Sequence, residues 1–332
     1  MGLANLSKVL GFIMLQVMLM IFVSQSECRP DPPTSRHLLK LVSSPSVLLS
    51  YHNGPTLSST PSNTISSSSV YIIWYGDFSE SQKSIVRDFF SSFNSDLESP
   101  SVSSWWKLTN GYTDTRGWTI PSQIYLEAEM SVSSSSRGKS LKNSDVEDLV
   151  VGSVKDGFFP TNSHGFYLVL TSEDVKVEGF CRSSCGRHAV VDTGDSQLVF
   201  GWVGNSAQQC AGRCAWPFAS PKFGSPESFP APLLAPNGDV GMDGLIINVA
   251  TILAGGFTNP FGNGYYQGDA GAPLEAATAC AGLYGPGAFP GFPGELSREV
   301  ITGISFNALG VNDRRFLLPS IWDPLNSQCS YP

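Results

Sequence analysis

The stretch that decides the fold class is Val70-Tyr71-Ile72-Ile73-Trp74-Tyr75-Gly76-Asp77. Its first six residues are all β-branched or aromatic, which predicts a buried strand. Glycine and aspartate end that strand, and Ser79 or Ser81 can cap a helix that continues to Phe93. A strand followed through a tight loop by a helix predicts an α/β fold, with an α+β arrangement as the alternative.

The same two patterns recur along the rest of the chain. Further strands are expected at residues 123–126, 166–170, 189–191 and 198–203, and further helices at residues 100–108, 146–154 and 241–256. The last of these helices is apolar on every side, which is typical of a helix buried in a core. We therefore predict one globular domain over residues 70–332.

The N-terminus indicates export. Lys8 precedes an apolar run over residues 9–23, and small polar residues follow it. A helix of that length spans about 22 Å, which is short for a bilayer core of about 30 Å. We predict a cleaved signal peptide over residues 1–28, with an uncleaved anchor as the alternative. Residues 29–69 are rich in Ser and Pro and are expected to be partly disordered, with an edge strand within residues 48–57.

Composition excludes two classes of partner. The 332 residues carry a formal charge of −8, and only 14% are charged. Lys and Arg do not cluster anywhere, whereas a nucleic-acid binder normally shows a basic patch. The same lack argues against a polybasic membrane surface. We expect no nucleic-acid partner and no membrane insertion once the signal is removed.

Six cysteines follow the signal region, namely Cys181, Cys185, Cys210, Cys214, Cys280 and Cys329. In an exported protein an even number predicts disulfides. Zinc is the alternative for the two CxxxC pairs, although structural zinc sites more often use CxxC spacing.

The predicted hairpin between the two CxxxC pairs suggests how they bond. Facing residues of an antiparallel pair have a constant sum of residue numbers. The pairs Cys181–Cys214 and Cys185–Cys210 share one sum, so we predict this nested scheme together with Cys280–Cys329. Bonding within each CxxxC is the alternative.

Histidines and tryptophans supply the remaining site hypotheses. His164 and His188 could form a metal or acid–base pair, or they could be loop histidines bonded to the backbone. The adjacent Trp105 and Trp106 could stack on sugar rings, or they could pack in the core. The chain has no His-Glu-x-x-His, Gly-x-Ser-x-Gly or phosphate-loop motif. We therefore predict no catalytic residue, no catalytic metal and no cofactor.

Several motifs carry a resemblance to a known family. They are Tyr51-His52-Asn53-Gly54-Pro55, Ile72-Ile73-Trp74-Tyr75-Gly76, Ser104-Trp105-Trp106, Phe180-Cys181-x-x-Ser184-Cys185-Gly186-x-His188, Gln209-Cys210-x-x-x-Cys214-Ala215-Trp216-Pro217, and the run from Thr258 to Gly268. On these residues the chain closely resembles the plant EXORDIUM-like, or phosphate-induced protein 1, family.

That resemblance implies a secreted, apoplastic, non-enzymatic protein that promotes cell expansion and growth. The implied setting is brassinosteroid-dependent growth that responds to carbon and energy status. A cell-wall component or an extracellular receptor would be its partner. The alternatives are an apoplastic hydrolase and a binder of wall polysaccharides through Trp105 and Trp106.

A second resemblance is more distant. Residues 251–260, followed by Glu275 and Cys280, are similar to the active-site helix of secreted zincin-like metalloproteases, which reads approximately His-Glu-Leu-x-Glu-x-x-Thr-Asp-Pro and later Glu-x-x-Asp-x-Cys. Four functional positions differ here, namely Thr251 for the histidine, Ile252 for the general base, Gly255 for the second ligand and Thr278 for the aspartate. This implies a zincin-like fold that has lost its metal site, with a coincidental buried helix as the alternative.

Overall fold

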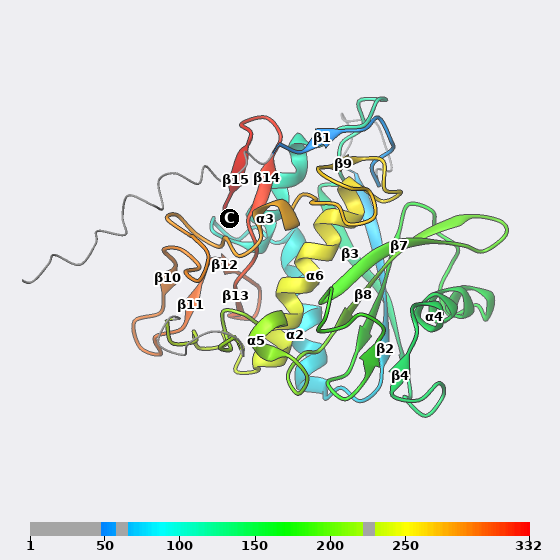
Figure 1. Ribbon diagram of the computed structural model, residues 1–332, viewed down its shortest axis with the longest axis horizontal. Coiled ribbons are helices and arrows are strands. Elements are labelled where there is room, and N and C mark those ends of the chain that lie inside the picture. The colour runs from blue at the N-terminus through cyan, green and yellow to red at the C-terminus, as the bar shows by residue number, and fades with distance from the viewer. Residues whose placement is uncertain (1–47, 58–65, 222–229) are drawn as a thin grey trace, which may run out of the picture. The chain divides into compact units, whose positions relative to one another are not determined.

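The computed structural model describes residues 48–57, 66–221 and 230–332. Its centre is a five-stranded sheet with the strand order β3-β2-β5-β8-β7 (Figure 1). These strands are β2 Ser67–Tyr75, β3 Gln123–Val132, β5 Phe166–Thr171, β7 Gly186–Asp192 and β8 Gln197–Gly204. The first four in the sheet are parallel, and β7 is antiparallel at one edge. The α/β prediction is therefore confirmed.

The central strands β2, β5 and β8 are buried on both faces of the sheet, as the apolar run in β2 predicted. Val70, Ile72 and Trp74 pack in one core with α2 Glu80–Ser91, α3 Val102–Lys107 and α6 Val240–Thr258. Tyr71 and Ile73 point to the opposite face, which packs against α4 Asn143–Lys155. Helices thus cover both faces, and this arrangement is typical of a largely parallel sheet.

Helix α6 is the longest helix of the described residues and lies in the larger core. It is long and apolar enough to cross a membrane by length and composition, but 83% of its most apolar window is buried. It is therefore a core helix, and the prediction of a buried helix over residues 241–256 is confirmed. Asp239 caps its N-terminus by accepting a hydrogen bond from the backbone N–H of Met242 at 3.0 Å.

The domain begins earlier than predicted. Leu49 and Leu57 lie in the larger core, and β1 Ser50–Tyr51 pairs with β9 Tyr265–Tyr266. Strand β2 also starts at Ser67, within the serine run that we had assigned to a partly disordered segment. The start at residue 70 was wrong, because core burial outweighs the Ser-rich local composition. The predicted signal peptide, residues 1–28, lies outside the described residues, as do residues 29–47 and 58–65.

The remaining elements are short and connect the layers. They are β4 Ser140–Leu141, β6 Lys176–Val177, α5 Ala211–Cys214, β10 Ser297–Arg298, β11 Ser305–Phe306, β12 Ala308–Leu309, β13 Arg315–Phe316, β14 Ile321–Asp323, β15 Gln328–Ser330 and the 3-10 helices η1 Ser92–Asn94, η2 Leu108–Gly111 and η4 Thr278–Cys280. The bond Cys280–Cys329 joins η4 to β15, as predicted.

Candidate functional site

The disulfides of the cysteine-rich region differ from the nested prediction. The structure pairs Cys181 with Cys210 and Cys185 with Cys214, with Cα atoms 5.7 and 5.4 Å apart. The hairpin itself is present as β7 and β8, but its paired residues run only from Asp192–Gln197 to Gly186–Val203. Beyond that point the chain turns into α5, so the two CxxxC segments align in parallel. Facing residues then share a constant difference, which is 29 in both bonds.

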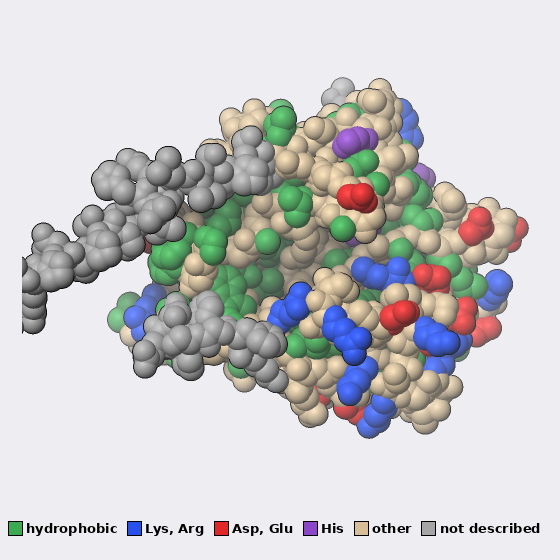
Figure 2. Space-filling model, viewed as in Figure 1, with side chains coloured by type: hydrophobic (Ala, Val, Ile, Leu, Met, Phe, Trp, Pro, Cys, Tyr) green, Lys and Arg blue, Asp and Glu red, His purple; other side chains and the backbone are tan. Residues whose placement is uncertain are grey.

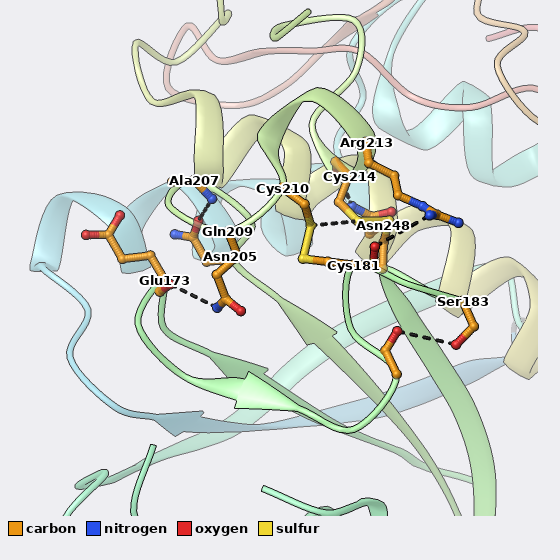
Figure 3. The surroundings of a disulfide bond; sticks show 12 residues. Glu173, Cys181, Ser183, Asn205, Ala207, Gln209, Cys210, Arg213, Cys214 and Asn248 are labelled. Atoms are coloured by element: carbon orange, nitrogen blue, oxygen red, sulfur yellow. Dashed lines mark hydrogen bonds between the residues drawn. A yellow bond between two sulfur atoms is a disulfide. The ribbon is translucent and has the colours of Figure 1, made fainter. Parts of the chain in front are cut away.

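Hydrogen bonds attach this disulfide pair to the rest of the fold. Figure 3 shows the Cys181–Cys210 bond with Arg213, whose guanidinium lies 3.4 Å from the Cys181 carbonyl oxygen. On the other side, Asn248 of α6 donates to the carbonyl oxygen of Cys214 at 2.7 Å. The bonds therefore fix the start of β7 against α5 and α6.

The tryptophan pair is not a ligand surface. Trp105 is 0% exposed and Trp106 is 1% exposed. The indole N–H of Trp105 donates to the carbonyl of Pro319 and that of Trp106 to the carbonyl of Pro121, both at 2.8 Å. Polysaccharide stacking on these rings is excluded because they pack in the core. Sequence could not separate these outcomes, since an adjacent aromatic pair fits both.

The two candidate histidines lie in different surroundings. His164 is exposed in the loop before β5, and its backbone carbonyl accepts from the Ser68 hydroxyl at 2.7 Å. His188 lies on β7 and is 11% exposed at its side chain. It lines a cleft that His164 does not line. The two histidines therefore do not form a joint site.

His188 forms an acid–base pair with Glu275 instead. Its Nε2 lies 2.9 Å from both carboxylate oxygens of Glu275, which is 10% exposed at its side chain. Asn259, directly after α6, donates a further hydrogen bond to Oε1 at 2.7 Å. The backbone N–H of Glu275 donates to the Thr278 hydroxyl at 2.6 Å. The Glu275 carboxylate thus connects three parts of the fold, namely the edge strand β7, the end of α6 and the segment before η4.

The other ring nitrogen of His188, Nδ1, takes no part in the pair with Glu275. Nδ1 is buried and has no hydrogen-bond partner among the described residues. When Nε2 donates to the Glu275 carboxylate, Nδ1 of the neutral ring is an acceptor without a described donor.

The pair lies in a cleft with a volume of about 1030 Å³. One wall is the outer edge of β7, and the other comes from residues 259–263 and 270–273. Ile252 of α6 contributes to the lining between them. Figure 2 shows the surface hollowed over the region where Figure 1 draws α6 beside β7.

The four positions that the metalloprotease resemblance compares with a metal site do not form a ligand set. The Thr251 hydroxyl donates to the Ile247 carbonyl of its own helix, and the Thr278 hydroxyl accepts a hydrogen bond from the backbone N–H of Glu275. Ile252 packs over Gly186 and Gly201. Within residues 48–57, 66–221 and 230–332, no three His, Cys, Asp or Glu side chains group so that they could hold a metal ion.

Position 255 shows why a metal ligand does not fit. A Cβ atom added to Gly255 would lie 2.5 Å from Oε2 of Glu275 and 3.2 Å from Nε2 of His188. The next residue, Gly256, approaches Phe166 as closely. The two glycines let α6 pass directly behind β7 and β5, and the Glu275–His188 pair fills the space that a ligand side chain would need.

Comparisons with known proteins extend over most of the chain. The family model described as the phosphate-induced protein 1 conserved region matches residues 49–332. Protein PHOSPHATE-INDUCED 1 of Nicotiana tabacum is 45% identical over 89% of this chain and 92% of its own length. Protein EXORDIUM of Arabidopsis thaliana is 45% identical over 85% of this chain and 88% of its own. No solved structure matches the chain. The chain therefore belongs to the phosphate-induced protein 1 family.

Proposed function

We propose that this chain is a secreted, apoplastic protein that promotes cell expansion and growth by binding a partner in the β7 cleft, without catalysis. Family membership supports the link to plant growth, and the apolar N-terminal run supports export. A brassinosteroid-dependent pathway that responds to carbon and energy status is the setting we propose.

The observation that supports binding rather than metal catalysis is that the space next to Gly255 is already filled. The Glu275 carboxylate takes the place of a ligand side chain, while an open cleft remains above it. We propose on this basis that the domain is zincin-like and has lost its metal site. Elemental analysis of protein purified without chelator should find far less than one zinc per chain. Stoichiometric zinc would overturn this part of the proposal.

Growth promotion can be tested in plants with one variant and a matched control. The full chain with a C-terminal tag is expected in the extracellular wash, and expressing plants should have longer cells. His188→Gln should abolish the gain in cell length, whereas His164→Gln, at the exposed histidine outside the cleft, should preserve it. Retention of the protein in the cell pellet, or full growth with His188→Gln, would contradict the proposal.

A hydrolase is the second candidate function. It is favoured by the His188–Glu275 pair, since a histidine beside a carboxylate on a cleft wall has the composition of a general acid–base pair. Turnover of wall polysaccharides or peptides by the secreted protein, lost in Glu275→Gln, would replace the binding proposal with this one. No turnover above that of Glu275→Gln would leave binding as the function.

A further inference from the structure

Strand β7 has a free side that faces the cleft. It is the last strand of the sheet and pairs only with β8 among the described strands. Residues Gly186, Arg187, His188, Ala189 and Val190 line the cleft. A free strand edge presents unpaired N–H and C=O groups and is a template for another strand.

The hydrogen bonds at the two ends of the hairpin show which residues face outward. The N–H of Gly204 donates to the Cys185 carbonyl at 3.3 Å, and the N–H of Thr193 donates to the Ser196 carbonyl at 3.0 Å. In an antiparallel pair, bonded and non-bonded residues alternate. The odd-numbered residues of β7 therefore bond to β8. The even-numbered residues Gly186, His188 and Val190 direct their backbone groups into the cleft.

These outward groups have no partner in the part of the chain that the structure describes. No hydrogen bond from a described residue reaches the backbone N–H or C=O of Gly186, His188 or Val190 on that side. They repeat at every second residue, which is the spacing of a strand that adds to an edge. An antiparallel segment would place one of its residues opposite each of the three, with both backbone bonds exchanged at each pair.

The charged residues that line the cleft indicate which side chains an added strand would carry. Three lining residues are ionisable, namely Arg187, His188 and Glu275. Arg187 points to the other face of the sheet, where it bonds to Glu147 of α4 at 2.9 Å. Among the described residues, therefore, no Lys or Arg pairs with the Glu275 carboxylate, whose hydrogen bonds come from His188 and Asn259. Opposite residues of a strand pair project to the same face, so the ligand residue facing His188 projects toward Glu275.

We infer that an extended peptide segment of another protein adds to the free edge of β7 as an antiparallel strand, with a Lys or Arg opposite His188. Three observations support this, namely the unused backbone groups, their two-residue repeat and the Glu275 carboxylate, which is bonded by His188 and Asn259 but by no described Lys or Arg. The second wall of the cleft, residues 259–263 and 270–273, favours a single chain segment over the edge of another sheet. The inference deepens the proposed function, on which it rests for the choice of the cleft as the binding site.

The test uses the purified, secreted full chain and a displayed library of random heptapeptides. Enriched peptides should carry Lys or Arg at one fixed position, and replacing that residue by Glu should weaken binding at least tenfold. N-methylation of the backbone should abolish binding at the basic residue and at the residues two before and two after it. The same modification at the neighbouring residues should have little effect.

Two protein variants provide an independent control. Val190→Pro removes an outward N–H without removing a β7–β8 bond, whereas Val190→Thr changes the same side chain and keeps that N–H. Binding by Val190→Pro should therefore be at least tenfold weaker than binding by Val190→Thr. The N-methyl scan decides the matter if Val190→Pro fails to fold. No enriched peptide, a scan without the two-residue period, or binding of wall oligosaccharides alone would overturn the inference.

These outcomes are separate from the growth assay. Peptide binding with the expected period, together with full growth in His188→Gln plants, would retain the strand-addition site and reject the cleft as the growth site. If His188→Gln plants lose the growth gain but the unmodified protein binds no peptide, the cleft is retained as the growth site and the strand-addition site is rejected.

Discussion

The pairs Trp105–Trp106 and His188–Glu275 both contain aromatic rings with polar nitrogen atoms, but they differ in whether those nitrogen atoms all have hydrogen-bond partners. The tryptophans are closed in by the core, and both of their N–H groups donate to carbonyls at 2.8 Å. The His188 side chain is 11% exposed, its Nδ1 has no partner in the described part of the chain, and the residue borders a large cleft. Complete satisfaction of polar atoms is typical of a structural group, whereas an unused polar atom beside a cleft is a reason to expect binding.

The largest effect expected from this comparison is on stability at the tryptophan pair. Trp106→Ala should lower the free energy of unfolding by about 3–5 kcal/mol, because it removes a fully buried ring and leaves a cavity. Denaturant unfolding of the secreted protein measures this. Phe158→Ala, at a side chain that is 63% exposed, should change stability by less than about 0.5 kcal/mol. Equal losses in the two variants would contradict the structural role of the pair.

Asp243 of α6 is a third buried group and titrates. Burial raises its pKa from 3.8 to about 7, against the opposing hydrogen bonds from Asn237. The folded state therefore holds the proton more tightly than the unfolded state. This contribution is complete below about pH 4 and is lost as the pH rises toward 7. Between pH 8 and pH 5 the free energy of unfolding should gain about 2–3 kcal/mol from this group.

Two aspartate variants separate that contribution from the rest of the chain. Asp243→Asn should remove the gain on acidification, whereas Asp195→Asn, at an exposed turn residue, should preserve it. An unchanged pH dependence in Asp243→Asn would show that other groups cause it.

Local pattern predicted the secondary structure but not the long-range pairings. The β2 run, the helix after Ser79 and the apolar α6 follow from periodicity and capping, which depend on neighbouring residues. The disulfide scheme failed because the pairing of β7 with β8 has a different register from the one that the nested bonds require, and because it ends at Gly186 and Val203, before either CxxxC segment. The partner of His188 is 87 residues away. The metalloprotease resemblance includes Glu275 among the matching residues, but no spacing in the sequence connects it with β7.

The close approach behind the cleft should have an intermediate effect. Gly255→Ala should lower the free energy of unfolding by about 1–3 kcal/mol, because its methyl group overlaps the Glu275 carboxylate. Gly152→Ala in α4 meets no atom within 4 Å, so it should stabilise the protein by about 0.5–1 kcal/mol.

A double-mutant cycle sharpens this prediction. Glu275→Ala removes the overlapping atoms, so the loss in the double variant should fall below the sum of the two single losses by at least about 0.5 kcal/mol. Strict additivity would show that the Glu275 side chain does not fill the space next to position 255.

The smallest loss of stability is expected at His188, in contrast to the large loss expected at the tryptophan pair. His188→Gln keeps a donor for Glu275, and Asn259 still donates to the same carboxylate at 2.7 Å. The loss should therefore be about 1 kcal/mol, the usual value for one weakened hydrogen bond. Circular dichroism should show an unchanged fold and a small shift in the denaturation midpoint. A loss of 3 kcal/mol or more would make His188–Glu275 a structural clamp like the tryptophan pair, and effects of His188→Gln on growth or peptide binding would then reflect unfolding rather than a site.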